Sequence, residues 1–163
     1  LLMQLSDIYA TGISPDQWFM YASQLAMLGW LILIFLPRKI KLLSVIPQYV
    51  IPFALSLLYA GSALTTYFTS EGGYDSLMGL RTLFESDQFL LAGWVHYLAF
   101  DLFIGAWIAR NADRLSISRL LQAPILIMTF MFGPVGLVLF LAMRMVLSPS
   151  TKVSENQKEV THA

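Results

Sequence analysis

The sequence contains no cysteine and few charged residues. Without cysteine, the chain has no disulfide bond, no thiolate metal site and no cysteine nucleophile. Asp, Glu, Lys and Arg make up only 12% of the 163 residues, whereas a soluble domain has roughly 25%. Apolar residues make up 57%. This composition is typical of an integral membrane protein.

Other absences exclude further classes of function. The formal net charge is zero and no basic tract is interleaved with aromatic residues, so we expect no nucleic-acid partner. GxSxG and phosphate-loop motifs are absent. One histidine within an apolar segment is too few ligands for a protein metal site, although a porphyrin needs only one axial ligand. The N-terminus lacks the cationic start of a signal peptide, which favours a bacterial protein or a mature processed form.

Four apolar segments are long enough to cross a membrane, which takes about 20 helical residues. They are apolar on all sides and show no strand-like alternation, so helices rather than a barrel must satisfy their backbones in lipid. The sequence predicts an all-α integral membrane four-helix bundle, formed as one domain by residues 1–147 and followed by a polar tail at 148–163, for which we expect disorder. The four segments are 17–36, 44–68, 89–109 and 121–147.

Basic residues predict the orientation of this bundle. They gather in the loop between the first two segments and in the loop between the last two, whereas the loop between the second and third has only Arg81. By the positive-inside rule, both basic loops are predicted to be cytoplasmic and both termini outside, most simply in a bacterial inner membrane. The basic loop residues are Arg38, Lys39, Lys41, Arg110, Arg114 and Arg119.

The loop between the second and third segments has a helical pattern of its own. Leu77, Leu80 and Leu83 recur at helical spacing after the glycine pair at 72–73. This predicts a short amphipathic helix on the outer interface. It either caps the bundle or acts as a gate over a lipid-side opening, in which case Arg81 lies at the outer mouth.

Two ionisable residues, His96 and Asp101, stand within the third apolar segment. Such a side chain near the middle of a bilayer costs about 2.5 to 3.5 kcal/mol, so both are expected to point into the bundle. By helical rise, His96 is level with Gln24 and close to Tyr59, and Asp101 is level with Thr129. The structural alternative is a packing role, with Asp101 bonded to Tyr59 or Thr129 and neutral His96 bonded to Gln24 or a carbonyl group.

The third segment presents two polar faces. At about 100° per residue, Trp94, Tyr97 and Asp101 share one face, and His96 and Phe100 share another about 140° away. One helix can offer both faces to a pocket only if partners surround it. The aromatic residues fit either core packing or the walls of a pigment site.

Four blocks of sequence resemble the abscisic-acid-deficiency-four-like family. Its plant members are plastid membrane proteins needed to make neoxanthin from violaxanthin. The resemblance covers about Trp18 to Arg144. The blocks are "GWLILIFLPR" at 29–38, "GGYDSLMGLRTLF" at 72–84, "LAGWVHYLAFDLFIGAWIAR" at 91–110 and "FGPVGLVLFLAMR" at 132–144.

This resemblance implies a membrane carotenoid or isoprenoid isomerase that acts on a lipid-soluble polyene. Neoxanthin formation opens an epoxide and removes a proton, which requires an acid and a base but no redox cofactor. In this role a protonated Asp101 donates to the epoxide oxygen and neutral His96 accepts the proton. The only bound ligand that we expect from the resemblance is a carotenoid. The predicted substrate-binding residues are Gln24, Tyr59, Arg81, Trp94, Tyr97 and Phe100.

Two other readings remain open. One is a non-catalytic subunit that holds a polyene or porphyrin within a larger membrane complex. The other is a small transporter or proton-conducting protein with Asp101 as its titrating group. The chain shows no internal repeat of the kind found in many transporters, although four helices can form a homodimer.

Overall fold

The computed structural model describes residues 14–147, and this part of the chain is helical without any strand. The predicted all-α class is therefore confirmed. The predicted polar tail at 148–163 lies outside the described residues. The helices are α1 (Pro15–Phe35), α2 (Lys41–Val45), the π-helix η2 (Ile46–Val50), α3 (Ile51–Tyr67), α4 (Leu77–Phe84), α5 (Asp87–Arg114), α6 (Arg119–Phe132) and α7 (Pro134–Leu147).

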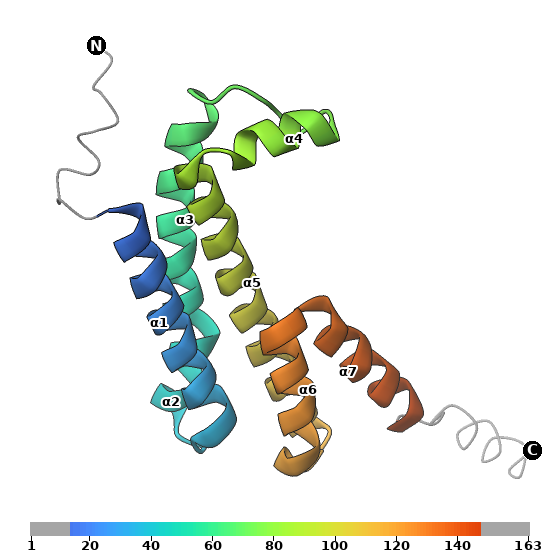
Figure 1. Ribbon diagram of the computed structural model, residues 1–163. Helices are drawn as coiled ribbons and strands as arrows, with labels where there is room; N and C mark the ends of the chain where they lie inside the picture. The colour runs from blue at the N-terminus through green and yellow to red at the C-terminus, as the bar shows by residue number, and fades with distance from the viewer. Residues whose placement is uncertain (1–13, 148–163) are drawn as a thin grey trace, which may run out of the picture.

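Within residues 14–147, three stretches are long and apolar enough to cross a membrane: Pro15–Phe35, Lys41–Tyr67 and Asp87–Arg114. They match the first three predicted segments, and the chain is a membrane protein. Within the second stretch, η2 widens the helix around Pro47, which has no N–H to donate to the preceding turn. Pro52 follows at the start of α3. Figure 1 shows α1, α3 and α5 side by side, with α4 in the connection between α3 and α5.

The fourth predicted segment, 121–147, is not one helix. The chain breaks at Gly133, which has a φ of 45° and whose N–H closes α6 on the Thr129 carbonyl. Pro134, which lacks an N–H, begins α7. Figure 1 shows α7 turning back toward the end of the molecule where α6 begins. A four-helix bundle is therefore not confirmed, and the course of α7 does not support the prediction that both termini lie on one side.

Helix α5 is the centre of the fold and packs against α1, α3, α4, α6 and α7. Its contact with α1 is close because each helix has a glycine at the crossing. Gly29 of α1 faces Leu102, and Gly105 of α5 faces the buried ring of Trp30. Lipid supplies no hydrophobic drive for association, so such close packing of small against large residues holds membrane helices together.

Helix α4 confirms the predicted amphipathic helix. Ser76 caps its N-terminus, accepting a hydrogen bond from the Gly79 N–H. Leu83 is fully buried, whereas Leu77 is 76% exposed. The Phe84 ring lies on Gly93 near the start of α5. Figure 1 shows α4 at the upper ends of α3 and α5, extending to one side of them, and it packs against α5.

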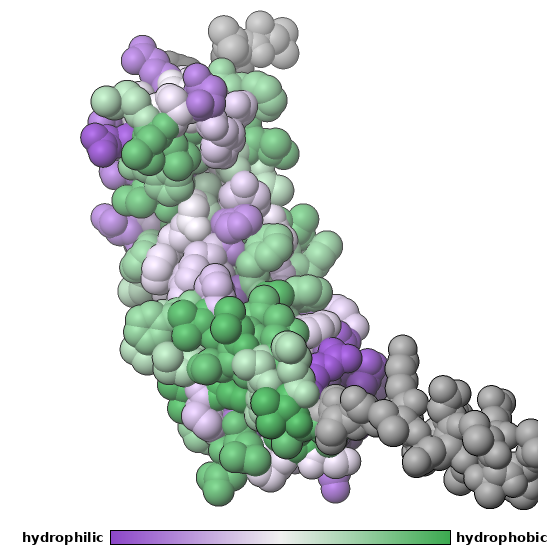
Figure 2. All heavy atoms as spheres, turned by 90° about the vertical axis from the view of Figure 1, so that its right-hand side faces the viewer, coloured by the Kyte–Doolittle hydropathy of each residue, from purple (hydrophilic) through white to green (hydrophobic). Residues whose placement is uncertain are grey.

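The described surface is largely apolar, with hydrophilic residues at one end and in a smaller patch lower on the face that Figure 2 shows. Figure 2 shows hydrophobic residues over most of the lower half of one face, and hydrophilic residues gathered toward its upper end. Large apolar side chains such as Phe35, Phe53 and Leu64 are more than half exposed, which suits contact with lipid chains. Figure 1 also places both basic loops at the end opposite α4.

Candidate functional site

Asp101 is buried in the middle of α5, as predicted, and it faces the break between α6 and α7. Its side chain lies so close to Gly133 that a Cβ at that position would stand 2.6 Å from Oδ1. The residue is 9% exposed, and Oδ2 is buried without a hydrogen-bond partner among the described residues. A buried polar oxygen without a partner is costly. Asp101 Oδ2 is thus an unsatisfied, buried acceptor within a membrane-spanning helix.

Tyr97 lies one turn from Asp101 on the same face of α5. Its hydroxyl donates toward the carbonyl oxygens of Phe130 (3.3 Å) and Met131 (3.4 Å) at the end of α6, and it also interacts with the Asp101 carboxyl group. Because a helix end leaves carbonyl groups without partners, Tyr97 stabilises the break that makes room for Asp101. The expected bonding of Asp101 to Thr129 is absent from this arrangement, since the Thr129 hydroxyl donates to the Ile125 carbonyl at 2.8 Å.

An aromatic row leads from Tyr97 to the surface. Trp94 stacks on Tyr97 with ring centroids 5.4 Å apart, and Phe19 of α1 lies 5.3 Å from Trp94. The Trp94 indole N–H donates to the Ser23 hydroxyl at 2.9 Å, which ties α5 to α1. Trp94 and Phe19 are 36% and 46% exposed. The predicted common face of Trp94, Tyr97 and Asp101 is therefore an aromatic strip that ends at a buried carboxyl group.

His96 does not point into the bundle, contrary to the prediction. It is exposed and lies in the seam between α3 and α5. Its ring stacks on Phe100 with centroids 4.6 Å apart and is tilted against Tyr59 at 5.2 Å. The cost of placing a polar side chain in lipid had predicted an interior polar partner for His96. Its ring instead contacts aromatic rings on an outer face. The structure therefore brings His96, Tyr59 and Phe100 together but separates them from Asp101.

An apolar groove of about 320 Å³ lies on the same side as His96. It runs between α5 and the η2–α3 stretch, and Phe53, Phe100 and Phe103 are among its walls. The wide turn at η2 and Pro52 lie on one side of it. Its aromatic, lipid-facing character suits a planar hydrocarbon.

Gln24 and Arg81 join neither group of residues. Gln24 is exposed on α1, and Arg81 is exposed on α4. A larger cavity of about 640 Å³ lies beside α4, at the ends of α1, α3 and α5, but Thr82 of α4 and Glu85, which follows α4, line it rather than Arg81. Its walls carry hydroxyl and carboxyl groups above an apolar floor that includes Trp18.

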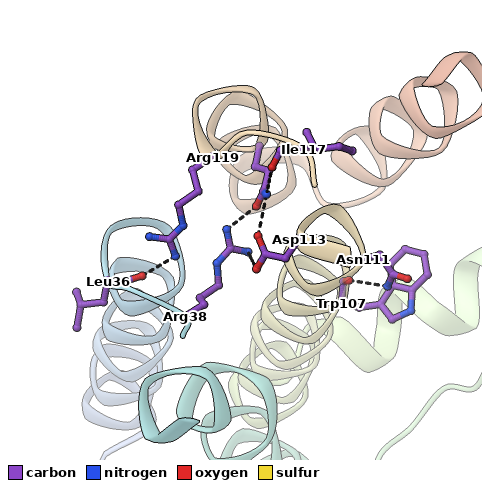
Figure 3. Close-up of polar contacts among 8 residues, drawn as sticks. Leu36, Arg38, Trp107, Asn111, Asp113, Ile117 and Arg119 are labelled. Carbon is purple, nitrogen blue, oxygen red and sulfur yellow. Dashed lines mark hydrogen bonds and ion pairs between the residues drawn. The ribbon is translucent and has the colours of Figure 1, made fainter. Parts of the chain in front are cut away.

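The opposite end holds a polar network that the sequence reading missed. Arg38, after α1, donates to Gln122 of α6 and pairs with Asp113 of α5 at 3.4 Å. Gln122 in turn donates to Asp113 at 2.9 Å and to the Ile117 carbonyl at 2.8 Å. Figure 3 shows these groups converging from three parts of the chain, with Arg119 bonded to the Leu36 carbonyl nearby. In the sequence, the available indication of this network was Asp113, the one acidic residue in the basic loops.

Burial affects the charge at this network. It lowers the pKa of the Arg38 guanidinium from its ordinary value, and the nearby Asp113 carboxylate opposes that change. A guanidinium group remains protonated in proteins, so the shift reflects the cost of removing the charge from water. Elsewhere in residues 14–147, no cluster of three His, Asp or Glu side chains is arranged to hold a metal ion.

Comparison with known proteins identifies the family. No curated protein and no solved structure matches the chain significantly. A family model described as ABA DEFICIENT 4-like matches residues 17–140, which is more than half of the 163 residues. The match spans α1 to α6 and half of α7, including Asp101 and the break that it faces. The chain therefore belongs to the ABA DEFICIENT 4-like family of membrane proteins.

Proposed function

We propose that this protein is a membrane isomerase of a lipid-soluble polyene, with Asp101 as its proton donor. The observation that carries the proposal is the buried Asp101 carboxyl group, whose Oδ2 has no hydrogen-bond partner within residues 14–147. An apolar setting favours the neutral carboxyl group, which can donate a hydrogen bond to an uncharged substrate oxygen. Because the chain belongs to this family, we propose that the substrate group is an epoxide on a carotenoid.

The proposed reaction conserves atoms and electrons. The carboxyl proton of Asp101 passes to the epoxide oxygen as the carbon–oxygen bond to the polyene side breaks, which leaves a tertiary hydroxyl group. The adjacent polyene carbon then loses its proton, and the electrons of that C–H bond form the second double bond of an allene. The carboxylate that donation leaves behind takes this proton, so one residue serves as acid and then as base.

Two features of the fold support this cycle. The N-terminus of α7 begins next to Gly133, and the partial positive charge of a helix N-terminus stabilises a nearby carboxylate. The strip of Phe19, Trp94 and Tyr97 offers stacked rings against which a polyene can lie while its end group reaches Asp101. His96 faces away from Asp101, so the proposal assigns it no role in the proton transfers.

An activity assay with purified protein in lipid vesicles tests the proposal. We expect conversion of the epoxide violaxanthin to the allene neoxanthin, followed by chromatography, and at least a 100-fold loss of rate in Asp101→Asn because a general acid contributes about 10²- to 10⁴-fold. Asparagine keeps the shape of the side chain. Asp87→Asn, exposed in the first turn of α5, is the matched control. Full activity in Asp101→Asn would contradict the proposed role.

A second candidate function is the binding of a polyene without turnover, which the groove along Phe53, Phe100 and Phe103 favours. In that case the gently solubilised protein should retain a carotenoid, visible as a structured polyene absorption band, and His96→Ala should reduce the amount retained. Solvent extraction identifies the pigment. A porphyrin band lost in His96→Ala would instead indicate axial ligation by His96, and a colourless protein would contradict permanent binding.

We further propose that the basic loops face the cytoplasm of a bacterial cell. The support is their common position at one end of the spanning helices together with the excess of Lys and Arg that marks cytoplasmic loops. The outer end then carries α4 and the large cavity beside it. Oligomerisation through the exposed apolar side of α7 is compatible with this orientation.

A further inference from the structure

A second cavity lies at the basic end of the molecule, far along α5 from Asp101. Its volume is about 360 Å³, and it is bounded by the chain after α1, by the α2–η2 stretch and by the last turns of α5. Three arginines and one aspartate line it, with a serine and a glutamine opposite. The polar lining residues are Arg38, Ser44, Gln48, Arg110, Asp113 and Arg114.

The positive charge of this cavity is not balanced by the described residues. Asp113 is the only acidic residue in the lining, and Arg38 already pairs with it at 3.4 Å. Asp113 also accepts a hydrogen bond from Gln122. Arg110 donates to the Tyr49 hydroxyl, which is neutral. Arg114 is exposed at the rim. The cavity therefore has a clear excess of positive charge.

Donor groups in the same lining lack partners. The Arg38 side chain is only 9% exposed. Its Nε is buried without a hydrogen bond among the described residues, and its Nη1 forms the ion pair with Asp113 but no hydrogen bond. The same is true of Arg110 Nε. Removing charged N–H groups from water without an acceptor is costly. An anion in the cavity would reduce that cost through charge and, after small side-chain adjustments, through hydrogen bonds.

We propose that this cavity binds a phosphate group, carried either by an anionic lipid headgroup or by free phosphate. Guanidinium groups present planar pairs of donors that match phosphate oxygens. Ser44 and Gln48 add neutral polar groups to the opposite wall. The lining includes Arg38 of the first basic loop and Arg114 at the end of α5. Lipid headgroups lie at such ends of spanning helices, and basic pockets between membrane helices commonly take anionic headgroups.

Titration of the full-length protein in a neutral detergent tests this site. The probes are short-chain phosphatidylglycerol, phosphatidylcholine with the same chains, and inorganic phosphate at constant ionic strength. We expect phosphatidylglycerol to raise the melting temperature more than phosphatidylcholine does, and Arg114→Gln to weaken its affinity roughly tenfold, the size of a lost charge-assisted hydrogen bond. Lys39→Gln, exposed at the same end but outside the lining, is the charge-matched control.

The outcomes separate the two sources and leave the proposal open to failure. Stabilisation by phosphatidylglycerol alone identifies a lipid headgroup, and equal stabilisation by inorganic phosphate identifies a free phosphate ligand. Arg110→Gln, facing the same cavity, is the second variant if Arg114→Gln melts early without any ligand. The proposal is overturned if neither anion binds, or if Lys39→Gln loses as much affinity as the cavity variants.

Discussion

Replacing Gly136 with alanine is expected to lower the free energy of unfolding by about 3 kcal/mol, at the upper end of the cost of overpacking. Gly136 is in the first turn of α7 and packs directly on Thr129 of α6. A Cβ at this position would overlap the Thr129 hydroxyl and stand 2.5 Å from its backbone nitrogen. Backbone cannot move aside as a flexible side chain can. The turn between α6 and α7 would have to open, and the surroundings of Asp101 would change with it.

Thermal melting in detergent, followed by helical circular dichroism, measures this effect. Gly61→Ala is the matched control because Gly61 also lies in an apolar helix, while a Cβ there meets nothing within 4 Å. Alanine at an open helical position should stabilise by up to about 1 kcal/mol. Equal melting temperatures for the two variants would show that α7 does not pack on α6 as described.

Replacing Gln122 with leucine is expected to destabilise the protein by roughly 3 kcal/mol, since hydrogen bonds to charged groups are worth about 1.5 to 3 kcal/mol each. Gln122 is 1% exposed and joins Arg38 to Asp113. Leucine has a similar size but no polar atoms. It would leave the buried Arg38 guanidinium with one acceptor fewer and would free the Ile117 carbonyl.

The same melting assay tests this prediction, with Gln24→Leu as the control. Gln24 is exposed on α1, so the same chemical change there should have little effect, or should favour contact with lipid. Gln122→Glu is informative as well, because it retains an acceptor for Arg38 and loses the donor to Asp113 and Ile117. If Gln122→Leu melted at the temperature of Gln24→Leu, the network of Figure 3 would not hold these helices together.

The membrane class and the first three spans were predictable because composition and length alone decide them. A run of about 20 apolar residues has few alternatives to a helix in lipid. The same holds for α4, whose leucines recur at helical spacing around Leu83. Local periodicity also predicted the common face of Trp94, Tyr97 and Asp101, since these residues belong to one helix.

The break at Gly133 and the position of His96 were not predictable in this way. Glycine followed by proline is compatible with a bent helix as well as with a reversal, and the contacts of Gly136 with Thr129 decide between them. The cost of placing a polar side chain in lipid predicted that His96 points into the bundle. Instead, its ring contacts those of Tyr59 and Phe100 in the seam between α3 and α5. Both outcomes depend on residues distant in sequence.

An all-helical membrane protein with a carboxyl group in its third span follows from the sequence alone, because hydropathy and helical periodicity are local properties. The groups around that carboxyl depend on how the helices pack. Packing placed Asp101 against Gly133 and Tyr97 and left His96 on another face. It also joined Arg38, Asp113 and Gln122 into one network, since long-range contacts follow from how the helices cross.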